Sequence, residues 1–115
     1  MKKINILKNK RDFDRIIKNN KPIKYKDYIV YFERIEQGTY HFGFSVGKKI
    51  GNAVTRNRIK RQLKSIVDKK VYQNSFNCII IVGRGVLERS FEEMKNNLFY
   101  VFDYLKIIEE DIDEK

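Results

Sequence analysis

The chain has 115 residues, a length that fits one domain, and 42% of them are hydrophobic, which is enough for a core and excludes a wholly disordered protein. No run of residues approaches the ~18 consecutive apolar side chains of a membrane span. The basic N-terminus lacks the pattern of a secretory signal, so we expect a cytoplasmic protein. One cysteine and one histidine exclude an internal disulfide and a Cys/His zinc cluster.

Positive charge is concentrated in the first part of the chain. The formal net charge is +10, and residues 1–67 carry 18 basic and 5 acidic side chains, whereas residues 68–115 carry 7 and 10. Residues 37–67 contain no Asp or Glu, and seven Lys or Arg fall within residues 48–64. A run of cations without acidic neighbours favours a polyanionic partner. We expect a nucleic acid rather than an anionic membrane.

The N-terminal segment predicts a short helix. Asn9 is a favourable helix cap, and Phe13, Ile16 and Ile17 recur at helical spacing on one face. Asparagine and proline residues within residues 19–22 end the helix.

Two strands are predicted to follow this helix and to pair as a hairpin. Residues 23–35 are rich in β-branched and aromatic side chains, which indicates one long strand with a bend or bulge at Asp27. Residues 37–38 form the turn. In residues 40–46, large side chains alternate with small ones, so the second strand has one large and one small face.

A basic helix is predicted after a glycine-bounded loop at residues 47–51, with Asn52 as its first candidate cap. Its buried stripe consists of apolar side chains at positions i, i+4, i+7 and i+8: Ile59, Leu63, Ile66 and Val67. At about 100° per residue, five polar or cationic residues lie opposite that stripe: Asn57, Arg58, Arg61, Lys64 and Ser65. Lys60 lies on the flank, and Arg56 lies nearer the apolar side in the first turn.

The C-terminal part predicts a buried strand and an amphipathic helix. Residues 78–82 form an unbroken apolar run, which is typical of a strand covered on both faces. Ser90 and Glu93 form a capping box for the last helix, and the acidic tail at about residues 109–115 is expected to fray. The order α-β-β-α-β-α within a single domain, residues 1–115, predicts an α/β fold, an α+β two-layer sandwich.

The residues that could catalyse a hydrolysis are scattered. His41 stands alone in a strand, and Ser45 and Cys78 lack partners suited to nucleophilic catalysis. Most carboxylates lie far along the chain from the cations, whereas metal-assisted hydrolysis would need them at one site. We expect a binding protein without a catalytic or metal site of its own.

The loop and basic helix over residues 48–61, with Arg56-Asn57-Arg58 at their centre, closely resemble the signature of the protein subunit of bacterial ribonuclease P. The resemblance spans nearly the whole chain. The family's early Asp-Phe pair is present at residues 12–13, its aromatic strand at 28–32 and its Gly-x-Ser-Val strand end at 43–46. The strand at residues 79–82 and the closing amphipathic helix match as well.

The resemblance implies a fold like the second domain of ribosomal protein S5, with a left-handed β-α-β crossover where general chain topology predicts a right-handed one. It also implies a subunit that assists a catalytic RNA in the endonucleolytic removal of the 5′ leader from precursor tRNA, giving a 5′-phosphate end. The protein would bind the leader and broaden substrate use. Mg²⁺ would be held by the RNA, so the protein alone would need no cofactor. The alternative is a non-enzymatic ribosomal or RNA-chaperone protein with the same basic helix.

Two binding surfaces follow from the resemblance, and neither a membrane nor DNA is an expected partner. The catalytic RNA would contact the basic helix and the loop before it: Lys48, Lys49, Asn52, Arg56, Asn57, Arg58, Lys60, Arg61 and Lys64. The precursor tRNA leader would lie in a cleft between the first helix and the sheet, lined by Phe13, Ile17 and Tyr31. Aromatic rings stack on unpaired bases without sequence preference, although Phe13 and Tyr31 could instead be core residues. Ile17 stands where the family often has a second Phe, which leaves plain apolar contact there.

Overall fold

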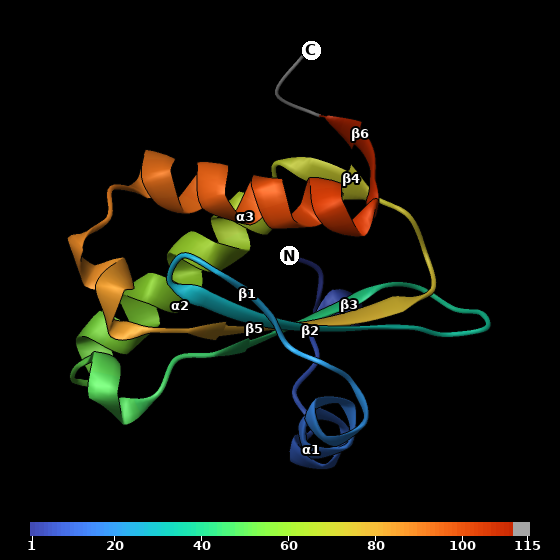
Figure 1. Ribbon diagram of the computed structural model, residues 1–115, viewed down its shortest axis with the longest axis horizontal. Helices are drawn as coiled ribbons and strands as arrows, with labels where there is room; N and C mark the ends of the chain where they lie inside the picture. The colour runs from blue at the N-terminus through green and yellow to red at the C-terminus, as the bar shows by residue number, and fades with distance from the viewer. Residues whose placement is uncertain (112–115) are drawn as a thin grey trace.

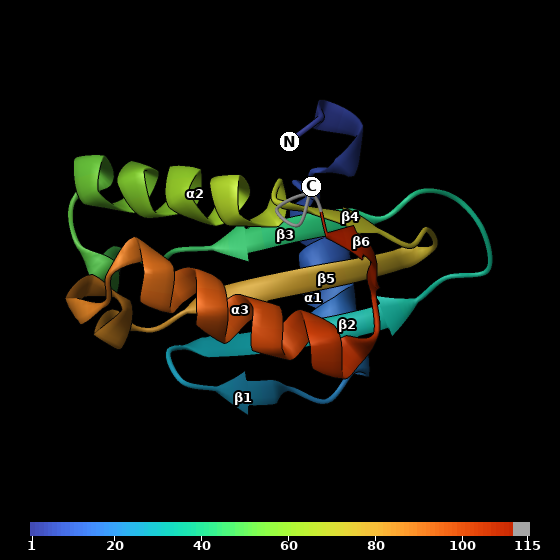
Figure 2. The same cartoon turned by 90° about the horizontal axis from the view of Figure 1, so that it is seen from above.

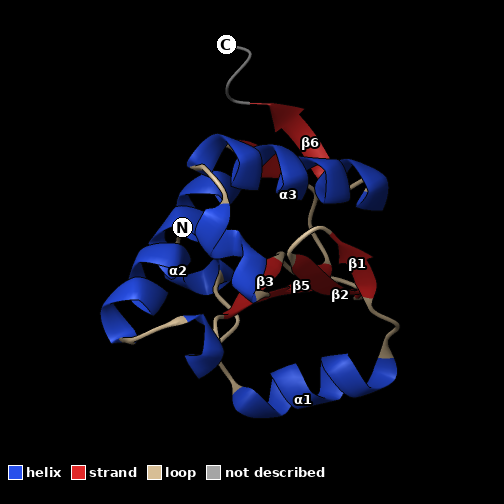
Figure 3. Ribbon diagram, turned by 60° about the vertical axis from the view of Figure 1, so that its left-hand side comes forward, coloured by secondary structure: helices blue, strands red, loops and turns tan. Residues whose placement is uncertain are grey.

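The computed structural model describes residues 1–111, which form helices on both faces of one main sheet (Figure 1). The four strands of the sheet have the spatial order β1-β2-β5-β3. Their bounds are Ile23–Tyr25 (β1), Tyr28–Arg34 (β2), His41–Ser45 (β3) and Phe76–Val82 (β5). The helices are α1 (Lys10–Asn19), α2 (Ala53–Val67) and α3 (Phe91–Leu105). Helices α2 and α3 cover one face of the sheet and α1 lies on the other (Figure 3).

The helices begin where the sequence predicts. The side chain of Asn9 accepts the N–H of Arg11, and that of Asn52 accepts the N–H of Thr55. Ser90 and Glu93 form the predicted capping box of α3. These side chains satisfy N–H groups that the first helical turn leaves without a partner. Among residues 1–111, no helix is long and apolar enough to cross a membrane.

The long strand predicted over residues 23–35 is instead a hairpin of β1 and β2. The two strands are antiparallel, with Tyr25 paired to Tyr28 across a turn at Lys26 and Asp27. Lys26 has a φ of 52°, a left-handed conformation that completes the reversal. The bend expected at Asp27 is therefore a full change of chain direction.

The predicted hairpin of residues 23–35 with residues 40–46 is wrong, because β5 lies between β2 and β3. β2 is antiparallel to β5 and β3 is parallel to it. The chain still reverses near Gly38, which has a φ of 112°. β5 takes the central place because both of its faces are apolar and must be covered. Its burial confirms the prediction for most of residues 78–82, since Cys78, Ile79 and Ile80 have no exposed surface, whereas Ile81 is half-buried.

The connection from β3 through α2 to β5 is a left-handed crossover. In Figure 2, which views the sheet from the face that α2 and α3 cover, β3 and β5 run in the same direction and α2 lies beside β3, on the side away from β5. This confirms the handedness implied by the family resemblance, against the general right-handed rule.

The main core lies between the sheet and the pair α2 and α3, as expected for a sandwich. The predicted stripe of α2 is buried, and aromatic rings pack at the centre. The Phe42 ring lies 5.6 Å from that of Phe76 and 5.5 Å from that of Phe102, between ring centres. Such tilted contacts add to the free energy gained from burial. On the opposite face, Ile16 of α1 covers a smaller second core and is also fully buried.

Two short strands, which the sequence did not predict, close the fold beside α3. β4 (Lys70–Tyr72) and β6 (Ile108–Asp111) form an antiparallel pair. The tail expected to fray from about Glu109 begins within β6, where Glu110 pairs with Val71 and Asp111 with Lys70. The rest of the predicted tail, residues 112–115, lies outside the described residues.

Candidate nucleic-acid interface

The basic surface begins in a 3-10 turn, η2 (Lys48–Ile50), that leads into α2. Ile50 is buried and anchors the turn, whereas Lys48 and Lys49 are exposed. The cap at Asn52, whose Oδ1 lies 2.9 Å from the nitrogen of Thr55, fixes the direction in which α2 leaves the turn. The two lysines are thus held next to the first turn of the basic helix.

The cationic side chains of α2 lie on the side of the helix away from its buried stripe, as the sequence predicts. Asn57, Arg58 and Arg61 are exposed, while Lys60 and Lys64 are half-buried. Within residues 1–111, none of the seven Lys and Arg of η2 and α2 takes part in an ion pair. Their charge is not neutralised by neighbours, so this face presents an uncompensated positive field. We call η2 and the exposed face of α2 the basic face.

Arg56 differs from the other arginines of the basic face. It is half-buried, and its Nε atom is enclosed without a hydrogen-bond partner among the described residues. A donor left without a partner in the interior costs free energy. This agrees with the position nearer the apolar side that the helical spacing predicts.

The three residues predicted to form the leader cleft all lie on the α1 side of the sheet, and all three are half-buried. The Phe13 ring covers the backbone of Gly43 so closely that a Cβ at Gly43 would lie 2.5 Å from Phe13 Cζ. At 100° per residue, Phe13 and Ile17 lie on the same flank of α1. Tyr31 points to the same side of the sheet, because its neighbour Val30 is fully buried in the main core on the other side.

The sheet also has an open hollow of about 410 Å³ that the sequence did not predict; its lining includes Ile29, two positions from Tyr31 along β2, but none of the three predicted residues. Its floor includes Ile29 and Ile81, which are paired across β2 and β5 and are half-buried. Gly83 and Gly85 lie at its rim. The signal for this surface was the alternation along β2 and β5, but only the strand pairing shows that the two isoleucines are neighbours. We call Phe13, Ile17, Tyr31, Ile29 and Ile81 the cleft.

The other flank of α1 holds a chain of polar contacts. The Arg15 guanidinium lies 3.1 Å from the Glu33 carboxylate, which accepts a hydrogen bond from the Asn77 amide at 2.9 Å. The other end of the Asn77 amide lies 2.8 Å from Nδ1 of His41. Burial alone would raise the pKa of Glu33, but the hydrogen bonds from Arg15 and Asn77 outweigh it and lower that pKa. These contacts hold α1 against the sheet.

The cysteine and the histidine have structural surroundings. Burial raises the pKa of the Cys78 thiol, and its side chain has no exposed surface, so it presents no thiolate to a substrate. His41 is half-buried and uses Nδ1 in the contact with Asn77. Among residues 1–111, no three His, Cys, Asp or Glu side chains are grouped as a metal site would require.

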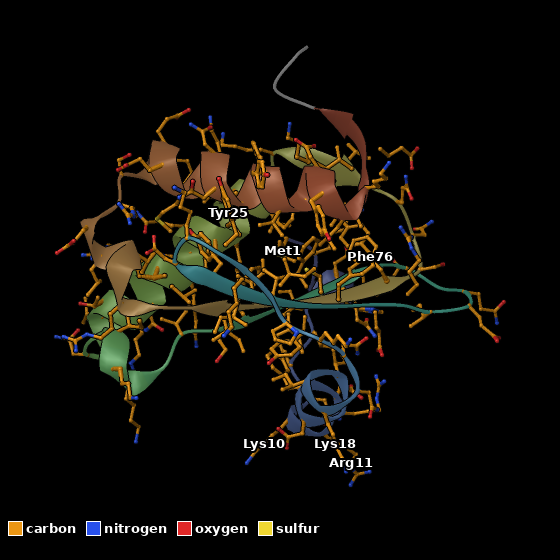
Figure 4. The ribbon with its side chains drawn as sticks, in the orientation of Figure 1. Met1, Lys10, Arg11, Lys18, Tyr25 and Phe76 are labelled. Atoms are coloured by element: carbon orange, nitrogen blue, oxygen red, sulfur yellow. The ribbon has the colours of Figure 1, made fainter. Side chains whose placement is uncertain are left out.

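The basic face and the cleft are separate surfaces. α2 and α1 lie on opposite faces of the sheet (Figure 3), so the predicted residues form two groups rather than one site. In α1 the side chains of Lys10, Arg11 and Lys18 point away from the sheet, and they are not part of the cleft (Figure 4).

Comparisons with known proteins agree on one family. The sequence model of a family described as Ribonuclease P matches residues 1–106. The Ribonuclease P protein component of Streptococcus pyogenes serotype M5 (strain Manfredo) is 34% identical over 110 residues, which cover 95% of this chain and 92% of that protein. The RNase P protein of Staphylococcus aureus has 29% identity and a TM-score of 0.80, covering 91% of this chain and 98% of its own.

A second solved structure supports the fold alone. The RNase P protein of Thermotoga maritima has 24% identity and a TM-score of 0.74, covering 83% of this chain and 92% of its own. These likenesses fit the predicted fold like the second domain of ribosomal protein S5. With the family's sequence model matched over nearly the whole length and a relative above 30% identity, the chain belongs to the ribonuclease P protein family.

Proposed function

We propose that the basic face binds the ribonuclease P RNA and that the cleft binds the 5′ leader of precursor tRNA. Membership of the family makes the chain a protein component of ribonuclease P, which acts in tRNA processing with an RNA partner. Its role as a subunit of this endoribonuclease decides against the ribosomal or RNA-chaperone alternative. The proposal assigns a separate partner to each of its two surfaces.

The absence of ion pairs on the basic face, within residues 1–111, is the observation that carries the first assignment. Guanidinium groups at Arg58 and Arg61 are exposed and can bind phosphates through two hydrogen bonds each. The lysines of η2 add charge beside them. When a phosphate backbone binds such a face, its condensed counterions are released into solution, so the affinity falls as the salt concentration rises.

Half-burial of Phe13 and Tyr31 supports the second assignment. Both side chains are held by the fold yet keep part of their surface open, and Ile29 and Ile81 extend the apolar floor beyond them. Unpaired bases pack on such rings without regard to sequence, which suits leaders of many sequences. Ile17 offers apolar contact at the cleft's flank.

We assign the chemical step to Mg²⁺ ions held on the RNA, which would hydrolyse the phosphodiester and leave a 5′-phosphate on the tRNA. The protein's own candidate groups are engaged elsewhere, since Cys78 is sealed in the core and His41 is bonded to Asn77. In this proposal the protein positions the leader, supports the RNA and is not itself catalytic. The cytoplasm remains its predicted location.

The test is cleavage of precursor tRNA by a bacterial ribonuclease P RNA across a range of Mg²⁺ concentrations, with and without the protein. We expect the protein to lower the Mg²⁺ concentration needed for cleavage and to cleave nothing alone. If the protein does not lower the required Mg²⁺ concentration at physiological salt, the assignment of the basic face to the RNA is contradicted. Cleavage by the purified protein without RNA would contradict the assignment of the chemistry.

A further inference from the structure

A pair of exposed tyrosines lies on α3, which covers the opposite face of the sheet from α1 (Figure 3). Tyr100 is 59% exposed and Tyr104 is 68% exposed, although both rings are large and largely apolar. The Tyr100 ring stacks on Tyr25 of β1, with 4.4 Å between ring centres and 20° between ring planes. Large exposed rings held in one place are typical of a binding surface.

These rings belong to a strip that continues along α3. Glu93, Asn97, Tyr100 and Tyr104 are spaced at i, i+4, i+7 and i+11, so they lie on one side of the helix. The strip lines two neighbouring hollows between α3 and the β1–β2 hairpin, one of about 220 Å³ at the tyrosines and one of about 200 Å³ near Asn97. Figure 4 shows Tyr25 between the hairpin and α3.

The strip combines flat rings with cations and amides. Lys26 lies with its Nζ 5.7 Å from the centre of the Tyr25 ring, and Lys24 is exposed beside it. Within residues 1–111, neither lysine takes part in an ion pair. Glu93 lines the hollow near Asn97, and its carboxylate keeps its negative charge while it accepts the N–H of Ser90 at 2.9 Å. Lys24 lines one hollow and Lys26 the other, so two lysines stand against one carboxylate and the lining has a net positive charge.

We propose that this strip, together with Tyr25 and Lys26 of the neighbouring hairpin, is a second binding surface for unpaired RNA on the α3 side of the sheet. Bases would stack on the exposed faces of the Tyr100 and Tyr104 rings, while Lys24 and Lys26 contact phosphates. The amides of Asn96 and Asn97 offer donors and acceptors to base edges. Lys24 and Lys26 also line the hollow beside the cleft, so the two surfaces adjoin at the β1–β2 turn. The proposal rests on the tyrosine rings of α3 and does not depend on the cleft.

Two other occupants fit the strip less well. A second copy of the chain would bring a net charge of +10 against an equal charge, and such self-repulsion disfavours association. A peptide could add a strand to the edge strand β1, but β1 has three residues, follows Pro22 and is flanked by lysines, features that discourage strand addition. A hollow of about 220 Å³ is also smaller than the roughly 300–1,000 Å³ of a small-molecule site, and it suits a single flat ring from a longer chain.

The experiment measures binding of a short fluorescein-labelled oligoadenylate to the full chain at raised salt, where phosphate contacts are screened. The test variant is Tyr100→Leu with Tyr104→Leu, which keeps apolar bulk and removes both rings. Its matched control is Tyr100→Phe with Tyr104→Phe, which keeps the rings. Leu87→Ala removes an exposed apolar side chain outside the strip. Because the substituted residues are exposed, we expect all variants to keep the melting temperature of the unmodified protein.

We expect the leucine variant to bind about tenfold more weakly and both controls to bind normally. Irradiation of a 5-bromouridine-substituted oligonucleotide with the unmodified protein should give adducts on the peptide that carries Tyr100 and Tyr104. Equal affinity of the leucine variant, or adducts only elsewhere, would overturn the proposal. The proposal would also be overturned if sedimentation showed that the unmodified protein is a dimer and the leucine variant a monomer, since the strip would then join two copies of the chain.

Discussion

The helices α1 and α2 are both basic, both begin at an asparagine cap, and both pack on the same sheet, yet they do different things with their charge. In α1, Arg15 is paired with Glu33, and Asp12 and Asp14 accompany the cations. In α2, five cations occur without an acidic residue, and within residues 1–111 none is in an ion pair. The first helix uses polar contacts to hold its place, and the second leaves its charge available.

This difference teaches that the composition of a helix does not decide its role. Uncompensated charge on α2 acts over the distance of a Debye length and suits an extended phosphate backbone. α1 instead contributes shape, because its Phe13 lies on Gly43 and leaves open apolar sheet beside it. We therefore expect changes at α2 to alter salt-dependent RNA affinity, and changes beneath α1 to alter stability and leader binding.

The largest effect on stability is expected at Gly43. Gly43→Val places a side chain where the Phe13 ring lies, and overpacking of this kind lowers the free energy of unfolding by about 1–3 kcal/mol. Gly47→Val is the matched control, because nothing lies within 4 Å of a Cβ at Gly47. Urea denaturation of both variants measures the difference. Equal stability of the two would mean that Phe13 is not held on Gly43 in solution.

Removing charge from α2 should weaken RNA binding with little effect on folding. For Arg58→Ala with Arg61→Ala, each lost phosphate contact should reduce the slope of log K against log salt by about 0.9, the value for duplex DNA. Lys10→Ala with Lys18→Ala removes the same charge from the outward side of α1 and should change the slope less (Figure 4). Filter binding to ribonuclease P RNA over a range of salt compares the two. If the slope of log K against log salt is the same in both double variants, the cations of α1 and α2 contribute equally to RNA binding and the distinction between the two helices is wrong.

The two asparagine caps allow a finer comparison. Asn52→Asp keeps an oxygen acceptor for the N–H of Thr55, so stability should be retained, but it adds negative charge to the basic face. RNA affinity should therefore fall, whereas Asn9→Asp at α1 should leave it unchanged. Asn52→Ala should instead lower the free energy of unfolding by about 1 kcal/mol. Equal RNA affinity of the two Asp variants would place the RNA away from the start of α2.

The smallest effect is expected at Glu33. The pKa of Glu33 is lower in the folded protein than its ordinary value of 4.5. The stability that the ionised carboxylate contributes is therefore present above pH 4.5 and is lost as the pH falls below that value. Glu33→Gln should flatten this part of the stability profile by no more than about 1 kcal/mol. Glu36→Gln, an exposed carboxylate in the following loop, should leave the profile parallel to that of the unmodified protein. Chemical denaturation from roughly pH 6 to pH 3 separates the variants.

Local patterns predicted the helices, their caps and the faces of the strands, because these depend on spacing within one element. The buried stripe of α2 and the capping box of α3 are examples. The split of β1 from β2 was missed because Lys26 takes a left-handed conformation without the glycine that usually indicates it. The strands β4 and β6 were missed because one has three residues and the other has an acidic sequence.

The strand order and the cleft floor could not be read from local patterns. Whether β5 pairs with β2, with β3 or with both depends on contacts between residues far apart in the chain, and so does the meeting of Ile29 with Ile81. The polar chain from Arg15 to His41 likewise joins four separate elements. The basic face, by contrast, lies within one stretch of sequence, so its residues could be named in advance.

The most direct test of two surfaces with two partners is Tyr31→Ala, assembled with ribonuclease P RNA. If Tyr31 stacks on a leader base, affinity for precursor tRNA should fall by about 1–3 kcal/mol, while affinity for mature tRNA and for the RNA subunit stays the same. The measurement is the ratio of precursor to mature tRNA affinity, taken together with the melting temperature of the protein. A lowered melting temperature with an unchanged ratio would mean that Tyr31 is a structural residue and would contradict the assignment of the cleft.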